Sequence, residues 1–245
     1  MENLPLYISL TFGIITLVTL FLFCRTIKGS DLKTAKSNFR IISPALIAWL
    51  ILQAFLAMNN IYSTHLNSLP PRIVILGILP PVFVILLLFN TKKGKLFIDS
   101  LPLLSITYTN TIRFFVEIVL YWLFLHKAIP ELMTFEGINF DIMAGITAPF
   151  IAYYGIGKSK ISINLILWWN IISLALLINI VIIAFLSAPS PLQKLGFDQP
   201  NIAILYFPFC WLPTFVVPVI IWGHLVSIRQ LFKNKNTYSS TIVKQ

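Results

Sequence analysis

Two ionisable residues inside a long apolar stretch are the first candidates for chemistry in this chain. Arg113 and Glu117 lie four residues apart between residues 103 and 125. In an α-helix this spacing puts both side chains on one face and permits a direct ion pair. Charged groups at membrane depth are costly and usually face a bundle interior or a wet cavity. We interpret Glu117 as a ligand-binding or proton-linked carboxylate and Arg113 as its partner, with a structural ion pair as the alternative.

Other polar residues extend this face or form a second one. Asn110 and Tyr121 fall with the ion pair on an arc roughly 80° wide at 100° per residue. Asn164 and Asn179 share a second stripe farther along the chain, whereas Asn170 is predicted to point elsewhere. Asparagine often bridges membrane helices, so helix bridging is favoured for the second stripe and lining of a ligand cavity is the alternative.

An acidic and amide-rich stretch precedes a segment interrupted by Gly and Pro. Its outer-face candidates are Glu136, Asn139 and Asp141, directly before residues 142–156. The spacing does not match an EF-hand loop. Short, interrupted segments are a pointer to transporter binding sites, and residues 73–89 carry a similar interruption at Pro80 and Pro81. The alternative is a solvated acidic loop that leads into a kinked helix.

The histidines and cysteines predict no metal site and no cofactor. His65 and His126 are expected at the outer face and His224 at the inner face, so the three are interpreted as interfacial residues. Cys24 and Cys210 form no CxxC motif and are expected to pack as small apolar residues.

Several enzyme and receptor classes lack their diagnostic residues in this sequence. The last apolar segment holds no lysine to attach retinal. The chain contains no HExxH zinc motif and no phosphate-binding P-loop. It also has no GxSxG nucleophile motif. Catalysis of these kinds is therefore not expected.

The elements that must position these residues are membrane helices. The chain has 245 residues, of which 58% are hydrophobic and only 11% charged, with a mean hydropathy of +0.87. Such a composition excludes a soluble enzyme, a disordered chain and a collagen-like fibre. A spanning helix needs about 20 mainly apolar residues. The sequence predicts an all-α, seven-helix membrane bundle with segments at 4–23, 41–61, 73–89, 103–125, 142–156, 161–186 and 202–228. Residues 1–228 form one membrane domain and residues 229–245 a short basic tail.

The placement of charge predicts the orientation of the bundle. The net charge is +10, and fourteen of the eighteen basic residues fall in alternate loops and in the C-terminal tail. Cytoplasmic loops carry the Lys/Arg excess, so the N-terminus is expected outside and the C-terminus in the cytoplasm. The acidic leader Met1–Asn3 and the lack of a cleavage site favour an uncleaved first helix. We expect a bacterial cytoplasmic membrane, with anionic lipid headgroups rather than nucleic acid as the inner partner. A second copy or another membrane subunit stays an open partner.

Three functional classes follow from these features. A carrier or sensor for a small solute, ion or lipid-like ligand predicts a cavity that reaches Glu117. An intramembrane lipid-modifying enzyme predicts a fixed pocket in which polar groups converge near 3 Å; no nucleophile–base pair is visible, so this class ranks lower. A structural subunit of a membrane complex predicts that Arg113 and Glu117 face outward.

Overall fold

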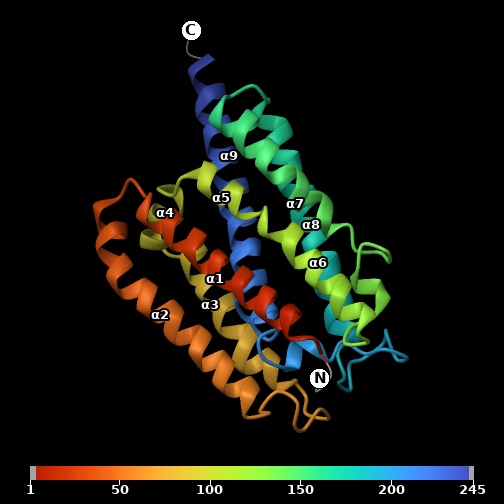
Figure 1. The fold of residues 1–245 in the computed structure, drawn as a ribbon. Coiled ribbons are helices and arrows are strands. Elements are labelled where there is room, and N and C mark those ends of the chain that lie inside the picture. Colours follow the sequence, from red (N-terminus) through yellow and green to blue (C-terminus); the bar gives the residue numbers. More distant parts are fainter. Residues whose placement is uncertain (1–3, 243–245) are drawn as a thin grey trace.

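The computed structural model describes the backbone of residues 4–242 and the side chains of residues 4–33 and 39–233. The leader Met1–Asn3, the side chains of Lys36 and Lys235, and Lys244 therefore lie outside the described part. Within that part the chain is helical and contains no strand. The N- and C-terminal ends lie at opposite ends of an elongated bundle (Figure 1). The predicted all-α fold is confirmed.

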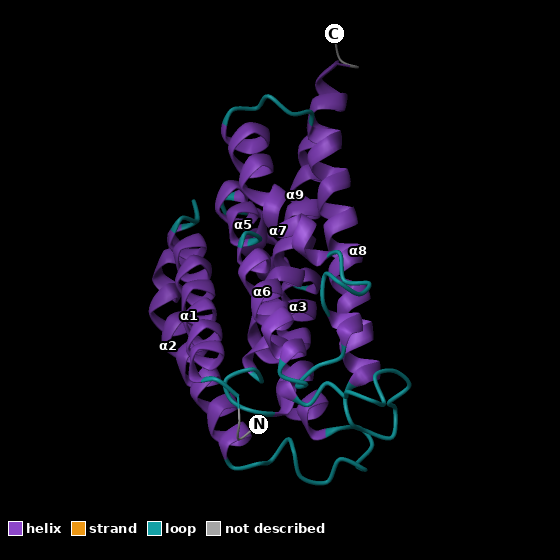
Figure 2. Ribbon diagram, turned by 45° about the vertical axis from the view of Figure 1, so that its right-hand side comes forward, coloured by secondary structure: helices purple, strands orange, loops and turns teal. Residues whose placement is uncertain are grey.

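The helical elements follow one another along the bundle. They are α1 (Leu6–Lys28), α2 (Lys33–Met58), η1 (Val74–Ile78), α3 (Leu79–Asn90), α4 (Lys92–Asp99), α5 (Leu103–Thr109), α6 (Ile112–Leu125), η2 (Glu131–Met133), α7 (Asp141–Phe150), η3 (Ile151–Gly157), α8 (Ile163–Ser187), η4 (Ala203–Leu205), η5 (Leu212–Val216) and α9 (Val217–Ile242). Figure 2 shows α1 and α2 side by side at one edge of the bundle.

Five of the described helical stretches are long and apolar enough to cross a membrane. They are Leu6–Lys28, Phe39–Met58, Leu103–Leu125, Ile163–Ser187 and Leu212–Lys233. A sixth results if Val74–Asn90 and Lys92–Asp99, which meet at a bend of 92°, are counted as one broken span. The predicted fifth segment consists of α7 and η3, and it is not among these candidates. The structure thus gives five or six candidate spans, and seven crossings stay a prediction.

Proline explains why three of these stretches are irregular. A π-helical turn lies directly before Pro80 and Pro81, another follows Pro149, and the third contains Pro213. Proline lacks the backbone N–H and clashes with the preceding turn, so the helix widens or bends around it. The predicted interruption of segments 73–89 and 142–156 is confirmed at these turns.

The last predicted segment begins too early in the sequence-based account. Residues 203–211 form a short 3₁₀ turn and a loop, and the final helical stretch begins only at Leu212 and continues to Ile242. Prolines 208 and 213 disfavour a regular helix through this region. The shift moves His224 from the predicted inner end to the middle of a helix.

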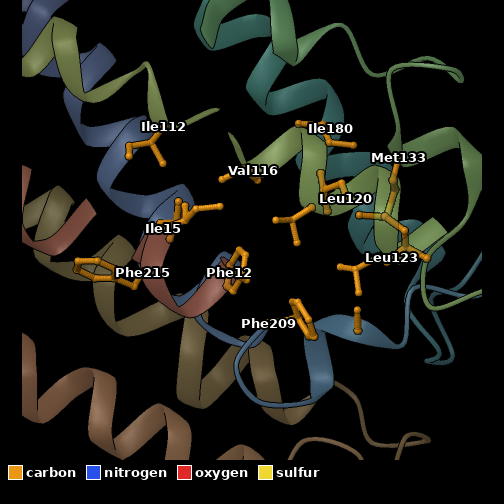
Figure 3. Close-up of a cluster of buried hydrophobic side chains, with 14 of the residues drawn as sticks. Phe12, Ile15, Ile112, Val116, Leu120, Leu123, Met133, Ile180, Phe209 and Phe215 are labelled. Carbon is orange, nitrogen blue, oxygen red and sulfur yellow. The ribbon is translucent and has the colours of Figure 1, made fainter. Parts of the chain in front are cut away.

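The final helix also forms the centre of the bundle. Within Leu212–Lys233, 61% of the spanning window is buried, compared with 28% in α1. The main apolar core forms around it, between α1, α6, α8 and the loop before η5 (Figure 3). Phe12 packs against Phe209 with ring centroids 5.3 Å apart. This core holds α6 and α8 against α9, and these helices carry most of the buried polar groups.

Candidate functional site

A buried cluster of polar side chains joins α6, α7, α8 and α9. Arg113 and Glu117 come from α6, Asp141 from the start of α7, Asn170 from α8 and His224 from α9. Each of these side chains is at most 3% exposed. The cluster therefore connects four helices inside an otherwise apolar bundle, where unpaired polar groups would be costly.

Arg113 forms its ion pair with Asp141. Its Nε donates to Asp141 Oδ2 at 2.7 Å, and its Nη2 pairs with Oδ1 of the same carboxylate. Nη2 also donates to the carbonyl oxygen of Ser173 at 2.9 Å. The expected pairing of Arg113 with Glu117 is therefore wrong. A two-point contact of this kind fits the planar guanidinium to the carboxylate and fixes its orientation.

The close approach of α6 and α7 explains this choice of partner. Gly145 of α7 lies so near α6 that a Cβ at this position would be 2.4 Å from the backbone nitrogen of Phe114. Asp141 is one helical turn before Gly145, and Arg113 immediately precedes Phe114. The contact between the two backbones thus brings Asp141 beside Arg113.

The contacts of His224 define its tautomer. Its Nε2 lies 2.9 Å from Arg113 Nη1, and its Nδ1 lies 3.0 Å from Asn170 Oδ1. Because a guanidinium has only donors, Nε2 accepts, and the ring proton sits on Nδ1 and is donated to Asn170. Asn170 Nδ2 in turn donates to the carbonyl of Ile166 at 2.9 Å, which fixes the amide orientation. His224 is therefore a neutral acceptor that holds the far side of Arg113.

Asn139 links the second carboxylate to this cluster. Its Nδ2 donates to Glu117 Oε2 at 2.7 Å and to the carbonyl of Met133 at 2.9 Å. Its Oδ1 accepts the backbone N–H of Asp141 at 3.0 Å. Across residues 4–242, Glu117 has no ion-pair partner and its Oε1 receives no hydrogen bond. One carboxylate oxygen of Glu117 is thus left for another donor.

A cavity of about 590 Å³ reaches both carboxylates. Glu117 and Asp141 line its inner part, and the loop from Tyr62 to Val74 lines another part. The remaining walls are mainly apolar side chains of α3, α8 and α9, including Val82, Ile85, Leu86, Val181, Ile182, Phe185, Pro218 and Ile221. Val82, Leu86 and Ile182 are also strongly exposed, so the cavity opens sideways between α3 and α8. Its volume lies in the range of small-molecule sites.

The other predicted site residues lie outside this cluster. Asn110 is buried and donates to the carbonyls of Ile106 and Thr107, while its Oδ1 has no partner among the described residues. Tyr121 stacks on Phe135 and hydrogen bonds to the exposed Glu136.

The predicted stripe on α8 faces outward. Asn164 is exposed, and Asn179 is exposed and donates to the carbonyl of Ile138 at 3.3 Å. The opposite face of α8 carries the buried Asn170 and Ser173, so Asn170 belongs to the site and the two stripe residues do not.

Sequence reasoning missed three contributors, namely His224, Asn170 and the carbonyl of Ser173. The helical spacing of Asn170, Ser173, Leu177 and Ile180 could have indicated the buried face of α8. His224 was misplaced because the start of the last helix was misplaced. Within residues 4–242, no three His, Cys, Asp or Glu side chains gather closely enough to hold a metal ion, and His65 and His126 do not join such a group.

The fold and site define an all-helical protein with five or six candidate membrane spans and a buried polar cluster beside a cavity. A family model described as "Domain of unknown function (DUF8737)" matches residues 70–232. This is more than half of the chain, and the chain belongs to this family. The matched region contains every residue of the cluster, whereas α1 and α2 precede it. No curated protein and no solved structure matches the chain.

Proposed function

We propose that this protein is a multi-pass membrane carrier or sensor that binds a small lipid-like ligand in the cavity between α3, α8 and α9. The observation that carries the proposal is Glu117, a buried carboxylate that lines a largely apolar cavity and keeps one oxygen without a hydrogen bond. Buried polar groups are costly without partners. A ligand with a hydroxyl or amine donor would supply the missing bond.

The Arg113 cluster supports this role by holding the wall of the site. Arg113 fixes Asp141 on one side and His224 on the other, and Asn139 connects Asp141 to Glu117. Such a fully bonded network keeps a polar group in one orientation. Arg113 is thus a positioning residue, whereas Glu117 is the ligand contact.

The bilayer is the second proposed partner. Seven crossings, with an outer N-terminus and a cytoplasmic C-terminus in a bacterial cytoplasmic membrane, agree with the loops around residues 59–73, 126–140 and 188–211 lying at the N-terminal end of the bundle (Figure 1). The opposite end carries α4, whose Lys92, Lys93 and Lys95 are suited to anionic lipid headgroups.

A lipid-modifying enzyme is the second candidate. It is favoured by the convergence of Glu117 and Asn139 at 2.7 Å on a pocket wall, as general acid–base chemistry requires. A purely structural subunit is disfavoured, because Arg113 and Glu117 are 3% and 2% exposed and do not face outward as that role predicts.

Small molecules that copurify with the full chain in phosphatidylcholine nanodiscs test the proposal. The comparison is wild type, Glu117→Gln and the control Glu136→Gln, which changes an exposed carboxylate outside the cavity. Mass spectrometry should find a bound molecule in wild type and the control, and at least about tenfold less in Glu117→Gln, as loss of a charge-assisted bond implies. Equal amounts in all three proteins would overturn the role of Glu117. Conversion of the molecule on incubation would favour the enzyme.

A further inference from the structure

The cavity has a second polar region at the loop between α2 and η1. His65, Ser68 and Arg72 of this loop line the cavity together with Tyr62. The nearby connecting loops lie at the same end of the bundle as the N-terminus (Figure 1). Glu117 lies eight residues before the end of α6, which corresponds to about 12 Å of helix. The cavity therefore has polar groups at its mouth and again in its interior.

The cation at the mouth lacks a carboxylate partner within residues 4–242. Arg72 donates from Nη1 to the neutral hydroxyl of Thr64 at 3.3 Å, and none of the described ion pairs includes it. A guanidinium has five donors and is suited to planar or tetrahedral anions. Most of its hydrogen-bonding capacity is thus available to a ligand.

A second polar group beside Arg72 also lacks a partner. The Oγ of Ser68 is buried and makes no hydrogen bond to any described residue. A buried hydroxyl without a partner is uncommon in folded proteins. An oxygen of a ligand bound at Arg72 is the acceptor that this hydroxyl lacks.

We propose that the ligand is an anionic amphiphile, such as a fatty acid or a single-chain phospholipid, with its anionic head at Arg72 and Ser68 and its chain in the apolar cavity. This inference rests on the proposed function and adds the charge and orientation of the ligand. The apolar walls on α3, α8 and α9 receive the chain, and the sideways opening between α3 and α8 lets it enter from the bilayer. A neutral lipid would leave Arg72 facing the cavity mouth without an anion.

Photolabelling of the full chain in phosphatidylcholine nanodiscs tests this inference. Two probes are compared, octadecanoic acid and octadecanol, each with a diazirine in the chain. They are applied to wild type, Arg72→Gln and the matched control Lys194→Gln, which removes an exposed cation at the same end of the bundle but outside the cavity. Size-exclusion elution and thermal unfolding establish that the variants fold.

We expect the acid to label peptides of α8 around residues 181–186 in wild type and in Lys194→Gln. Arg72→Gln should reduce this labelling about tenfold and leave labelling by the alcohol within about twofold, because only the acid loses a charge-assisted bond. Equal labelling by acid and alcohol with no effect of Arg72→Gln overturns the anionic head but leaves the proposed function standing. No labelling of the cavity by either probe, or crosslinks from the cavity wall to another protein, overturns both.

Discussion

Gly145 lies against the backbone of Phe114, and this contact sets the partner of the neighbouring arginine. A Cβ at Gly145 would stand 2.4 Å from the nitrogen and 2.9 Å from the Cα of Phe114. Both of these atoms belong to backbone and cannot move aside without separating α6 from α7. The pairing of Arg113 with Asp141 thus depends on a glycine that has no polar atom of its own in the cluster.

Gly145→Ala should therefore destabilise the protein. Overpacking against backbone costs about 1–3 kcal/mol, and the two helices must separate at the site. The matched control is Gly13→Ala on α1, where a Cβ would meet nothing within 4 Å and where alanine favours the helix by up to about 1 kcal/mol. Thermal unfolding in detergent should show a lower Tm for Gly145→Ala and an unchanged or higher Tm for Gly13→Ala. Equal Tm values would contradict the close contact.

Asp141→Asn should cost more than loss of a surface carboxylate. Removal of one member of a buried ion pair leaves the other charge uncompensated and costs about 3–5 kcal/mol. The exposed Asp198→Asn is the control and should change stability by less than about 0.5 kcal/mol. The double variant Arg113→Met with Asp141→Leu should recover much of the lost Tm, because no charge stays buried. A double variant as unstable as the sum of the single changes would count against this account.

His224→Leu should destabilise the cluster even though histidine carries no charge in its described role. The substitution removes the acceptor of Arg113 Nη1 and the donor to Asn170 Oδ1. An unpaired buried group costs about 1–3 kcal/mol. His126→Leu, which alters an exposed histidine, is the comparison. A loss of Tm in both variants, or in neither, would mean that the hydrogen bonds of His224 have no special role.

Acidification should weaken the contact between α4 and α9. Asp99 accepts from Arg229 Nε at 2.8 Å and from Lys233 Nζ at 3.0 Å. Burial alone would raise the pKa of Asp99, but the hydrogen bonds and charges of these two cations hold it below its usual 3.8. The contribution is therefore complete above pH 4 and is lost as the pH falls through the lowered pKa. Tm measured from pH 7 to pH 3 should fall less steeply in Asp99→Asn than in wild type or in the exposed control Asp31→Asn. Parallel curves for all three would refute the coupling.

The sequence predicts the helical class and the buried position of Arg113 and Glu117, because both follow from composition and from the cost of charge in apolar segments. It does not predict the pairing. The i,i+4 spacing favours Glu117 as the partner of Arg113, whereas the contact at Gly145 depends on how two helices meet. His224 was misplaced for a local reason, since the prolines before it delay the start of the last helix. The cavity arises from the packing of α3, α8 and α9, which one chain without relatives does not encode as a pattern.

A high-resolution density map of the full chain purified in phosphatidylcholine nanodiscs tests the central claim most directly. The account predicts elongated non-protein density in the cavity, with a polar atom within about 3.2 Å of Glu117 Oε1, as a hydrogen bond requires. Glu117→Gln should weaken that density, and Glu136→Gln should not. A cavity without such density in wild type, or density that does not approach Glu117, would contradict it.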